Sequence, residues 1–241
     1  MKLTIRILIY PLIVLMFVIL TSSSLRNDPA KDEQVKNDPT SATGTVTDRD
    51  GNVYKTVTIG MQVWMAENLK TTKFRNGKPI PYVQINSTWA DLNTGAYCWY
   101  NNDASAGKAK NGALYNWYAV NDSRNIAPAG WHIPSEAEWT ILTTFLKGKS
   151  LAGGKLKETS TSHWASPNSD ATNSSGFTAL PGGYRNKDGV FGNVNIMGGW
   201  WTITEYSKSV AWYRYVDCNG SDIYIRSTFK NSGFSVRCIK D

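Results

Sequence analysis

The chain has 241 residues, with 26 Lys and Arg against 19 Asp and Glu, and its net charge of +7 is spread along the sequence. Hydrophobic residues at 41% and charged residues at 19% exclude disorder for most of the chain and predict one folded domain with a tail. The lysines stand singly or in loose pairs rather than in a dense basic stripe, so no nucleic-acid partner is predicted.

The first 24 residues follow the order of an export signal. Lys2 and Arg6 precede an uninterrupted apolar run over residues 7–20, and small polar residues follow up to Ser24. The run is shorter than the roughly 20 residues that a membrane-spanning helix needs, so we expect a cleaved signal peptide, with an uncleaved N-terminal anchor as the alternative. We therefore expect an exported protein, in the periplasm, at the cell surface or secreted, that touches a membrane only through this segment if at all.

Residues 25–43 offer almost no side chains to bury. They are mainly Asn, Asp, Pro, Lys, Ser and Thr, and so few apolar groups cannot offset the entropy cost of ordering the chain. This segment is predicted to be a flexible tether, and the folded domain is predicted to cover residues 44–241.

Two β-branched runs open the folded domain. Residues 45–47 and 53–59 are separated by the turn sequence Asp48-Arg49-Asp50-Gly51, in which Gly can take a positive φ, so a β-hairpin is expected. A short strand over 62–65 follows. The acidic turn is a poor calcium loop, because its Gly stands at the fourth position and not the sixth. Calcium therefore has no support in the sequence, and no cofactor is predicted.

Two short helices are predicted against this β-rich background. The first covers residues 113–120, where three apolar positions follow the i, i+3, i+4 spacing of a buried helical face. The second begins at Ser135, which with Glu138 three residues later has the pattern of a capping box, and it is expected to end at Gly148.

In the last third of the chain, Gly and Asn residues separate short strands that are rich in aromatic residues. These strands are expected over residues 199–206, 210–215, 222–227 and 233–239. Two short helices, several short antiparallel strands and long loops indicate an α+β domain.

The cysteines and histidines do not indicate a metal or redox centre. Cys98, Cys218 and Cys238 have no C-x-x-C partner and no neighbouring His, so we expect one disulfide with a thiol left over, or buried thiols, and the spacing selects no pair. His132 and His163 are too few for a metal centre and are interpreted as structural. No metal ligand and no catalytic residue is predicted.

Six motifs resemble, in the same order, those of one known family. They are TIGMQVWMAENL (58–69), YCWYNND (97–103), GALYNWYAV (112–120), GWHIPSEAEW (130–139), ALPGGYR (179–185) and GFSVRC (233–238). Over residues 44–241 the chain is similar to the Fibrobacter succinogenes major paralogous domain family. The resemblance implies an exported protein of the Bacteroidota or Fibrobacterota with a C-type-lectin-like fold, whose long loops form a binding face.

One departure from the family concerns the cysteines. Members usually have a Cys just before the GWH motif, where this chain has Ala127. The resemblance therefore leaves Cys238 without its usual partner, and it makes Cys218 the candidate partner for a replacement disulfide.

Residues 130–139 also resemble a motif of the formylglycine-generating sulfatase-modifying family, which shares the lectin-like fold. That resemblance implies oxidase chemistry with two nearby thiols as copper ligands. Only Cys218 precedes the last motif in the region where the pair is needed, so the enzyme hypothesis lacks an essential residue.

Aromatic residues beside amides and acids suggest a sugar-binding surface. Sugar C–H faces stack on aromatic rings, and sugar hydroxyls bind amides, carboxylates and guanidinium groups. Trp64, Trp117 and Trp139 are assigned to the core. The candidate ligand-binding residues are Trp99, Tyr100, Asn101, Asn102, Asp103, Tyr184, Arg185, Trp200, Trp201 and Glu205.

These observations predict a non-catalytic binding module of the cell envelope, with glycan as the first ligand class to test. The first alternative is a protein–protein interaction subunit of a surface assembly, with an envelope protein as its partner. The second alternative is an enzyme on a scaffold like that of the sulfatase-modifying family.

Overall fold

The computed structural model of the protein describes residues 42–106 and 111–241. The predicted signal over 1–24 and the predicted tether up to residue 41 lie outside these residues. The first described element is a strand that begins at Ala42, so folded structure begins two residues before the predicted boundary. Within the described residues, no helix combines the length and the apolar character needed to span a membrane.

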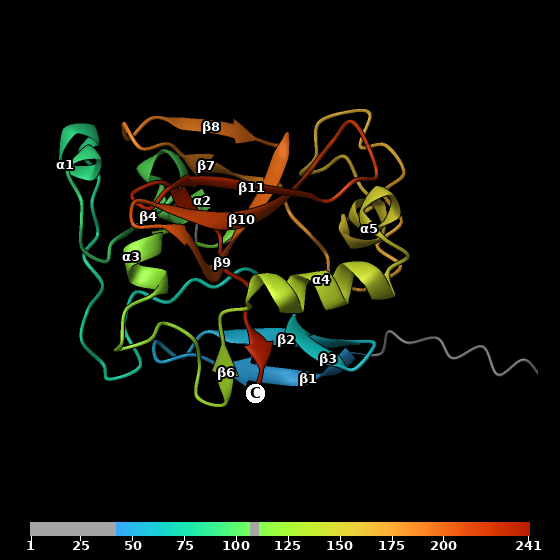
Figure 1. Ribbon diagram of the computed structural model, residues 1–241, viewed down its shortest axis with the longest axis horizontal. Coiled ribbons are helices and arrows are strands. Elements are labelled where there is room, and N and C mark those ends of the chain that lie inside the picture. Colours follow the sequence, from blue (N-terminus) through green and yellow to red (C-terminus); the bar gives the residue numbers. More distant parts are fainter. Residues whose placement is uncertain (1–41, 107–110) are drawn as a thin grey trace, which may run out of the picture. The chain divides into compact units, whose positions relative to one another are not determined.

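The first of three sheets is built around the N-terminal hairpin and closed by the C-terminus (Figure 1). All neighbouring strands in it are antiparallel. The predicted turn is confirmed: the Asp48 carboxylate accepts hydrogen bonds from the Asp50 and Asn52 backbone N–H groups, and Gly51 has a φ of 82°. In spatial order the strands are β1 (Ala42–Thr47), β2 (Val53–Ile59), β3 (Gln62–Met65), β13 (Ile239–Lys240) and β6 (Trp131–His132).

The second sheet joins the middle of the chain to its end. Its central strand pairs on one side with a strand before the main helices and on the other with a hairpin after them. In spatial order the strands are β4 (Tyr97–Cys98), β5 (Leu114–Asn116), β12 (Gly233–Phe234), β7 (Gly182–Arg185) and β8 (Phe191–Val194).

The third sheet has the order β11 (Tyr224–Phe229), β10 (Val210–Asp217), β9 (Met197–Ser207). Side chains alternate between its faces, so Tyr213 lies on one face and Arg214 on the other. Its strands overlap the predicted ones, with ends shifted by up to two residues. The predicted strand over 233–239 is instead split into β12 and β13.

Both predicted helices are present, but the first is shorter than predicted. Residues 114–116 form β5 rather than the start of a helix, because they pair with β4 and β12 and are buried on both faces. Only Trp117–Val120 (α3) is helical, and the Asn116 side chain caps it. The other helices in the described residues are α1 (Asn86–Ala90), α2 (Ala104–Ala106), α4 (Glu136–Phe145) and α5 (Lys149–Leu156), with a 3₁₀ turn at Tyr100–Asn102.

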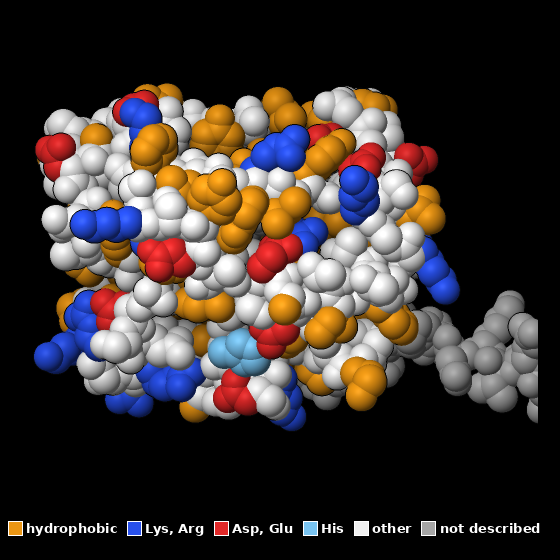
Figure 2. Space-filling model, viewed as in Figure 1, with side chains coloured by type: hydrophobic (Ala, Val, Ile, Leu, Met, Phe, Trp, Pro, Cys, Tyr) orange, Lys and Arg blue, Asp and Glu red, His pale blue; other side chains and the backbone are white. Residues whose placement is uncertain are grey.

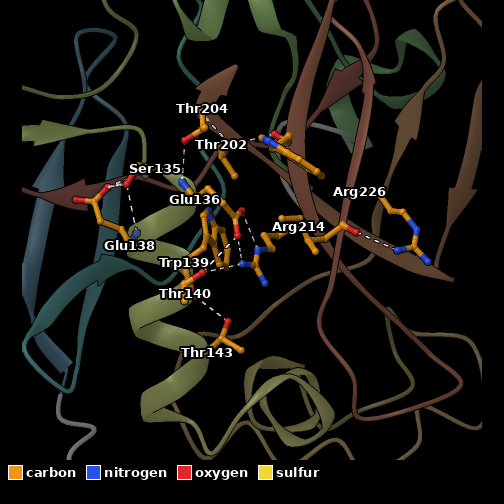
Figure 3. A network of polar contacts seen from close by, with 12 residues as sticks. Ser135, Glu136, Glu138, Trp139, Thr140, Thr143, Thr202, Thr204, Arg214 and Arg226 are labelled. Carbon is orange, nitrogen blue, oxygen red and sulfur yellow. Dashed lines mark hydrogen bonds and ion pairs between the residues drawn. The ribbon is translucent and has the colours of Figure 1, made fainter. Parts of the chain in front are cut away.

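Helix α4 begins at the predicted capping box. The Ser135 hydroxyl accepts a hydrogen bond from the Glu138 N–H, and the Glu138 carboxylate accepts one from the Ser135 N–H. Figure 3 shows this cap beside Glu136, whose carboxylate meets Arg214 from β10. The Thr204 hydroxyl of β9 accepts a hydrogen bond from the Glu136 N–H, at 2.9 Å. The third sheet is therefore tied to the start of α4.

Two aromatic clusters form most of the core. In one, Trp201 packs edge-on against Phe234, with ring centroids 5.0 Å apart. In the other, Trp64 packs against Trp139, with centroids 4.9 Å apart. The assignment of Trp64, Trp117 and Trp139 to the core is confirmed, because each is at most 3% exposed. Helices and β-rich sheets together confirm the α+β class.

Candidate functional site

An open cleft of about 590 Å³ lies where the β7–β8 hairpin, the start of β9 and strands β10 and β11 meet. Figure 1 shows these elements together, at the end of the domain away from the first sheet. The cleft is lined by Tyr184, Asn186, Lys187, Asp188, Asn193, Ile196, Met197, Tyr213, Tyr215, Asp217, Asn219, Thr228, Phe229, Ser232 and Phe234.

Stacked aromatic rings form the floor of the cleft. Phe234 is buried, and the half-buried Tyr213 stacks on it with centroids 4.3 Å apart and planes 25° apart. Tyr215 continues the stack beyond Tyr213 at 5.9 Å, and Tyr184 packs on Phe234 at 5.8 Å. Because the faces of these rings are packed against one another, the rings present their edges and hydroxyls to the cleft.

The hydroxyls of Tyr184, Tyr213 and Tyr215 are available for a ligand. None of the three has a hydrogen-bond partner among the residues that the structure describes. Burial, together with the neighbouring Tyr215, raises the pKa of Tyr213 to about 12. The Tyr213 hydroxyl therefore keeps its proton at neutral pH and can both donate and accept a hydrogen bond.

The rim of the cleft carries amides, one ammonium group and two carboxylates. The Asn219 and Asn193 side chains are exposed at the ends of β10 and β8. Asp217 accepts the Asn219 N–H at 2.8 Å, and Lys187 pairs with Asp188 at 2.7 Å. The rim therefore offers both hydrogen-bond donors and acceptors, and it carries charged side chains of both signs.

The β7–β8 turn that forms one wall is held from behind by Arg185. This side chain is fully buried, and it donates to the carbonyls of Gly189 at 2.8 Å and Gln84 at 2.7 Å. The Asn186 side chain accepts the backbone N–H of Val190 across the turn. Gly189 has a φ of 84°, as expected for the Asp-Gly hairpin turn at this point.

Four of the predicted ligand-binding residues are core residues instead. Trp200 and Trp201 have no exposed surface, because successive residues of β9 point to opposite faces of the strand and pack in different aromatic clusters. Trp99 is 4% exposed and packs on Tyr97, and Arg185 is fully buried. A ring or guanidinium that is at most 4% exposed has too little surface to bind a ligand, so the structure contradicts these four assignments.

Of the remaining candidates only Tyr184 is a cleft residue, although the 3₁₀ turn at Tyr100–Asn102 contacts β7 and β8 beside it. Residues 100–103 form a separate loop, in which Asn101 and Asn102 have positive φ and Asn102 donates to the Gln84 carbonyl. Glu205 pairs with Lys230 and does not line the cleft.

The residues that sequence reasoning missed are Tyr213, Tyr215 and Phe234 of the floor. The Tyr-Arg-Tyr alternation in β10 was the available signal, because residues two apart share one face of a strand. The contribution of Phe234 depends on the pairing of sheets distant in sequence, which no local pattern reveals.

All three cysteines are free and buried. The proposed Cys218–Cys238 disulfide is therefore not formed. The two residues belong to different core clusters, which is the physical reason for their separation. Burial raises the pKa of the Cys98 thiol to about 12 and raises that of Cys238 as well, so both are poor nucleophiles.

His132 is bound between two carboxylates. Its Nδ1 lies 2.7 Å from Asp241 and its Nε2 2.7 Å from Glu138. Burial lowers its pKa, but the hydrogen bonds to Asp241 and Glu138 outweigh burial, so the pKa is raised. The histidine thus ties the C-terminus to the start of α4 and lies outside the cleft.

A second surface feature is a small apolar groove between the β2–β3 turn and α4. Met61 is fully exposed at the turn, and Ile141 and Phe145 are 55% and 40% exposed. The groove has only seven lining residues, Ile59, Gly60, Met61, Thr140, Ile141, Thr144 and Phe145.

Comparison with known proteins identifies the family. The family model described as the Fibrobacter succinogenes major domain matches residues 57–240, which is most of the chain. Neither the curated proteins nor the solved structures contain a match. Since the match spans all three sheets apart from β1 and the first half of β2, the chain belongs to the Fibrobacter succinogenes major domain family.

Proposed function

We propose that this protein is an exported, non-catalytic binding module of the cell envelope, with a C-type-lectin-like fold, and that it binds a glycan in the aromatic cleft. The observation that carries the proposal is the combination of a stacked aromatic floor, three tyrosine hydroxyls without partners in the described part of the chain, and an amide-bearing rim.

This combination suits a saccharide for a physical reason. A sugar ring alternates apolar C–H groups with hydroxyls that both donate and accept hydrogen bonds. Ring edges and Met197 provide apolar contact, while tyrosine hydroxyls and the Asn193 and Asn219 amides can match either role of a sugar hydroxyl. The paired charges at Lys187 and Asp188 favour a neutral glycan over a strongly acidic one.

The protein–protein alternative has less support. A stable protein interface uses roughly 20 to 30 residues on each side, far more than the seven that line the apolar groove. On the face drawn in Figure 2, hydrophobic side chains over β10 and β11 are interspersed with charged ones rather than forming one continuous apolar area.

The enzyme alternative would need a reactive group in the cleft. Among the described residues, the cleft lining includes no cysteine and no histidine, and burial raises the pKa of the Cys98 and Cys238 thiols elsewhere in the protein. Asp188 and Asp217 are its carboxylates, and each already has a partner within its own turn. The cleft is therefore better suited to binding than to proton transfer.

A glycan-array screen tests the proposal. Residues 25–241, which include the whole compact unit Asp38–Asp241, would be screened against neutral and acidic glycans. We expect binding to neutral glycans, confirmed by calorimetry in solution. The absence of binding by a protein that melts cooperatively would overturn the glycan proposal and favour an envelope-protein partner.

A further inference from the structure

Lys157 is a buried lysine whose ammonium group lies behind the wall of the cleft. It follows α5 directly and has no exposed surface. Its Nζ donates three hydrogen bonds to backbone carbonyls: to Ser169 at 2.8 Å, Asp217 at 2.9 Å and Gly220 at 2.8 Å. All three donors of the ammonium are thus used, each on a main-chain oxygen.

The three carbonyls come from two different segments of the chain. Ser169 belongs to the loop after α5, while Asp217 is the last residue of β10 and Gly220 belongs to the loop between β10 and β11. The Lys157 ammonium also lies 5.7 Å from the centre of the Trp164 ring. A single positive charge therefore holds together two segments that are separated by some fifty residues of sequence.

The surrounding helix is shaped to let these loops approach. A Cβ atom at Gly153 would lie 2.1 Å from the Asp222 carbonyl oxygen, and one at Gly154 would lie 2.5 Å from that of Asp170. The Gly154 N–H donates to Ser221 at 3.1 Å. The loops therefore rest directly on the backbone of α5, with Lys157 at its end.

One of the two loops is part of the cleft. Asp217 and Asn219 line it, and the Asp217 carbonyl is one of the Lys157 partners. Burial lowers the pKa of Lys157, and the nearby carboxylates of Asp217 and Asp170 oppose this effect. The ammonium is thus flanked by acidic side chains as well as by carbonyls.

Carbonyl and carboxylate oxygens from neighbouring loops are the groups that a loop-stabilising calcium ion would use. Here a lysine ammonium binds three such carbonyl oxygens. We propose that Lys157 is a positioning residue that acts as an internal cation: it fixes residues 217–220 in the cleft wall, so that ligand binding requires Lys157 and is independent of calcium. This inference rests on the proposed function of the cleft.

The test compares Lys157→Met with Lys155→Met. Lys155 lies in the last turn of α5, two residues before Lys157, but its ammonium donates to the Leu146 carbonyl and not to the cleft loop. Val57→Ala, a core truncation in β2, measures the effect of lower stability alone. For each variant, hydrogen exchange of the amides over 217–222 and the affinity for a neutral glycan from the array would be measured, in calcium and in EDTA.

We expect Lys157→Met to speed exchange over 217–222 by tenfold or more and to weaken glycan binding by tenfold or more. Lys155→Met and Val57→Ala should leave both close to wild type below their melting temperatures. Wild-type exchange and affinity should be equal in calcium and in EDTA, a measurement that needs no variant to fold.

Two results would overturn the inference: exchange over 217–222 that Lys157→Met leaves unchanged, or wild-type loop exchange that rises in EDTA and falls again with calcium. A wild-type protein that binds no glycan would instead overturn the proposed function. In that case the exchange measurements still decide the role of Lys157.

Discussion

Arg214 of β10, whose side chain is buried, forms an ion pair with the partly buried Glu136 in the first turn of α4. On the same strand, the neighbouring Tyr213 faces the cleft. One strand thus contributes the cleft floor on one face and is anchored to a helix on the other, as Figure 3 shows for the Arg214 side. The rigidity of the cleft therefore depends on a contact that no ligand would touch.

Replacing Arg214 with Met should destabilise the fold strongly. The change leaves Glu136 without its charged partner and removes the hydrogen bond to Thr140, at a cost of about 3 kcal/mol in the free energy of unfolding. The double variant Arg214→Met/Glu136→Met should recover at least half of that loss, because no charge is left unpaired. Urea denaturation measures both; equal stability of the single variant and wild type would show that the pair contributes nothing.

The His132 contacts should make stability depend on pH. The raised pKa of folded His132 means that its contribution is complete below the unfolded value of about 6.5 and is lost as pH rises through the folded pKa. Burial raises the pKa of Glu138, but the hydrogen bonds from Ser135 and His132 outweigh burial, so the pKa of the folded carboxyl is lowered. The contribution of Glu138 to stability is therefore lost as pH falls through the folded pKa.

The variant His132→Gln should therefore be destabilised most near pH 6. Since the imidazole is partly exposed, the expected loss is only about 0.5 kcal/mol there and close to zero at pH 9. Thermal unfolding at the two pH values measures the difference, and an equal loss at both would indicate packing rather than charge.

Gly153 should tolerate no side chain. In Gly153→Ala the new Cβ would meet the Asp222 carbonyl at 2.1 Å, and the backbone must shift at a cost of about 3 kcal/mol. Gly220→Ala is the matched control, since its nearest atom would be 3.8 Å away. Melting temperatures of the two variants measure the contrast; similar values would contradict the close packing of the loop on α5.

The buried thiols should resist modification in the folded protein. Cys98 and Cys238 have no exposed surface, and burial raises the pKa of both thiols. Iodoacetamide at pH 8 should label neither until denaturant is added, and mass spectrometry of the labelled peptides reads the outcome. Rapid labelling of the native protein would contradict their burial.

Local signals predicted much of the fold. The bounds of β2 and β3 follow from β-branched alternation and a turn sequence, and the start of α4 follows from the capping box. Where pairing with distant strands decided the structure, local reasoning failed. Leu114 satisfies a helical spacing with Trp117 and Tyr118, yet it belongs to β5, which lies between β4 and β12.

The site was less predictable than the fold. Adjacent Trp200 and Trp201 look like a ligand platform, but only the sandwiching of β9 between two clusters shows that both are buried. The cleft floor needs Tyr184, Tyr213 and Phe234 from three strands in two sheets. Such a site is a property of strand pairing between distant segments rather than of any local motif.

The measurement that tests the central claim most directly is glycan affinity after removal of the cleft hydroxyls. Tyr184→Phe/Tyr213→Phe keeps the ring stack and deletes two hydrogen-bonding groups, while Tyr206→Phe removes the hydroxyl of an exposed tyrosine outside the cleft. At about 1 kcal/mol for each hydrogen bond, the double variant should bind its glycan more weakly by about tenfold or more, with Tyr206→Phe unchanged. Equal affinity of all three proteins for the glycan would contradict the assignment of the cleft as the binding site.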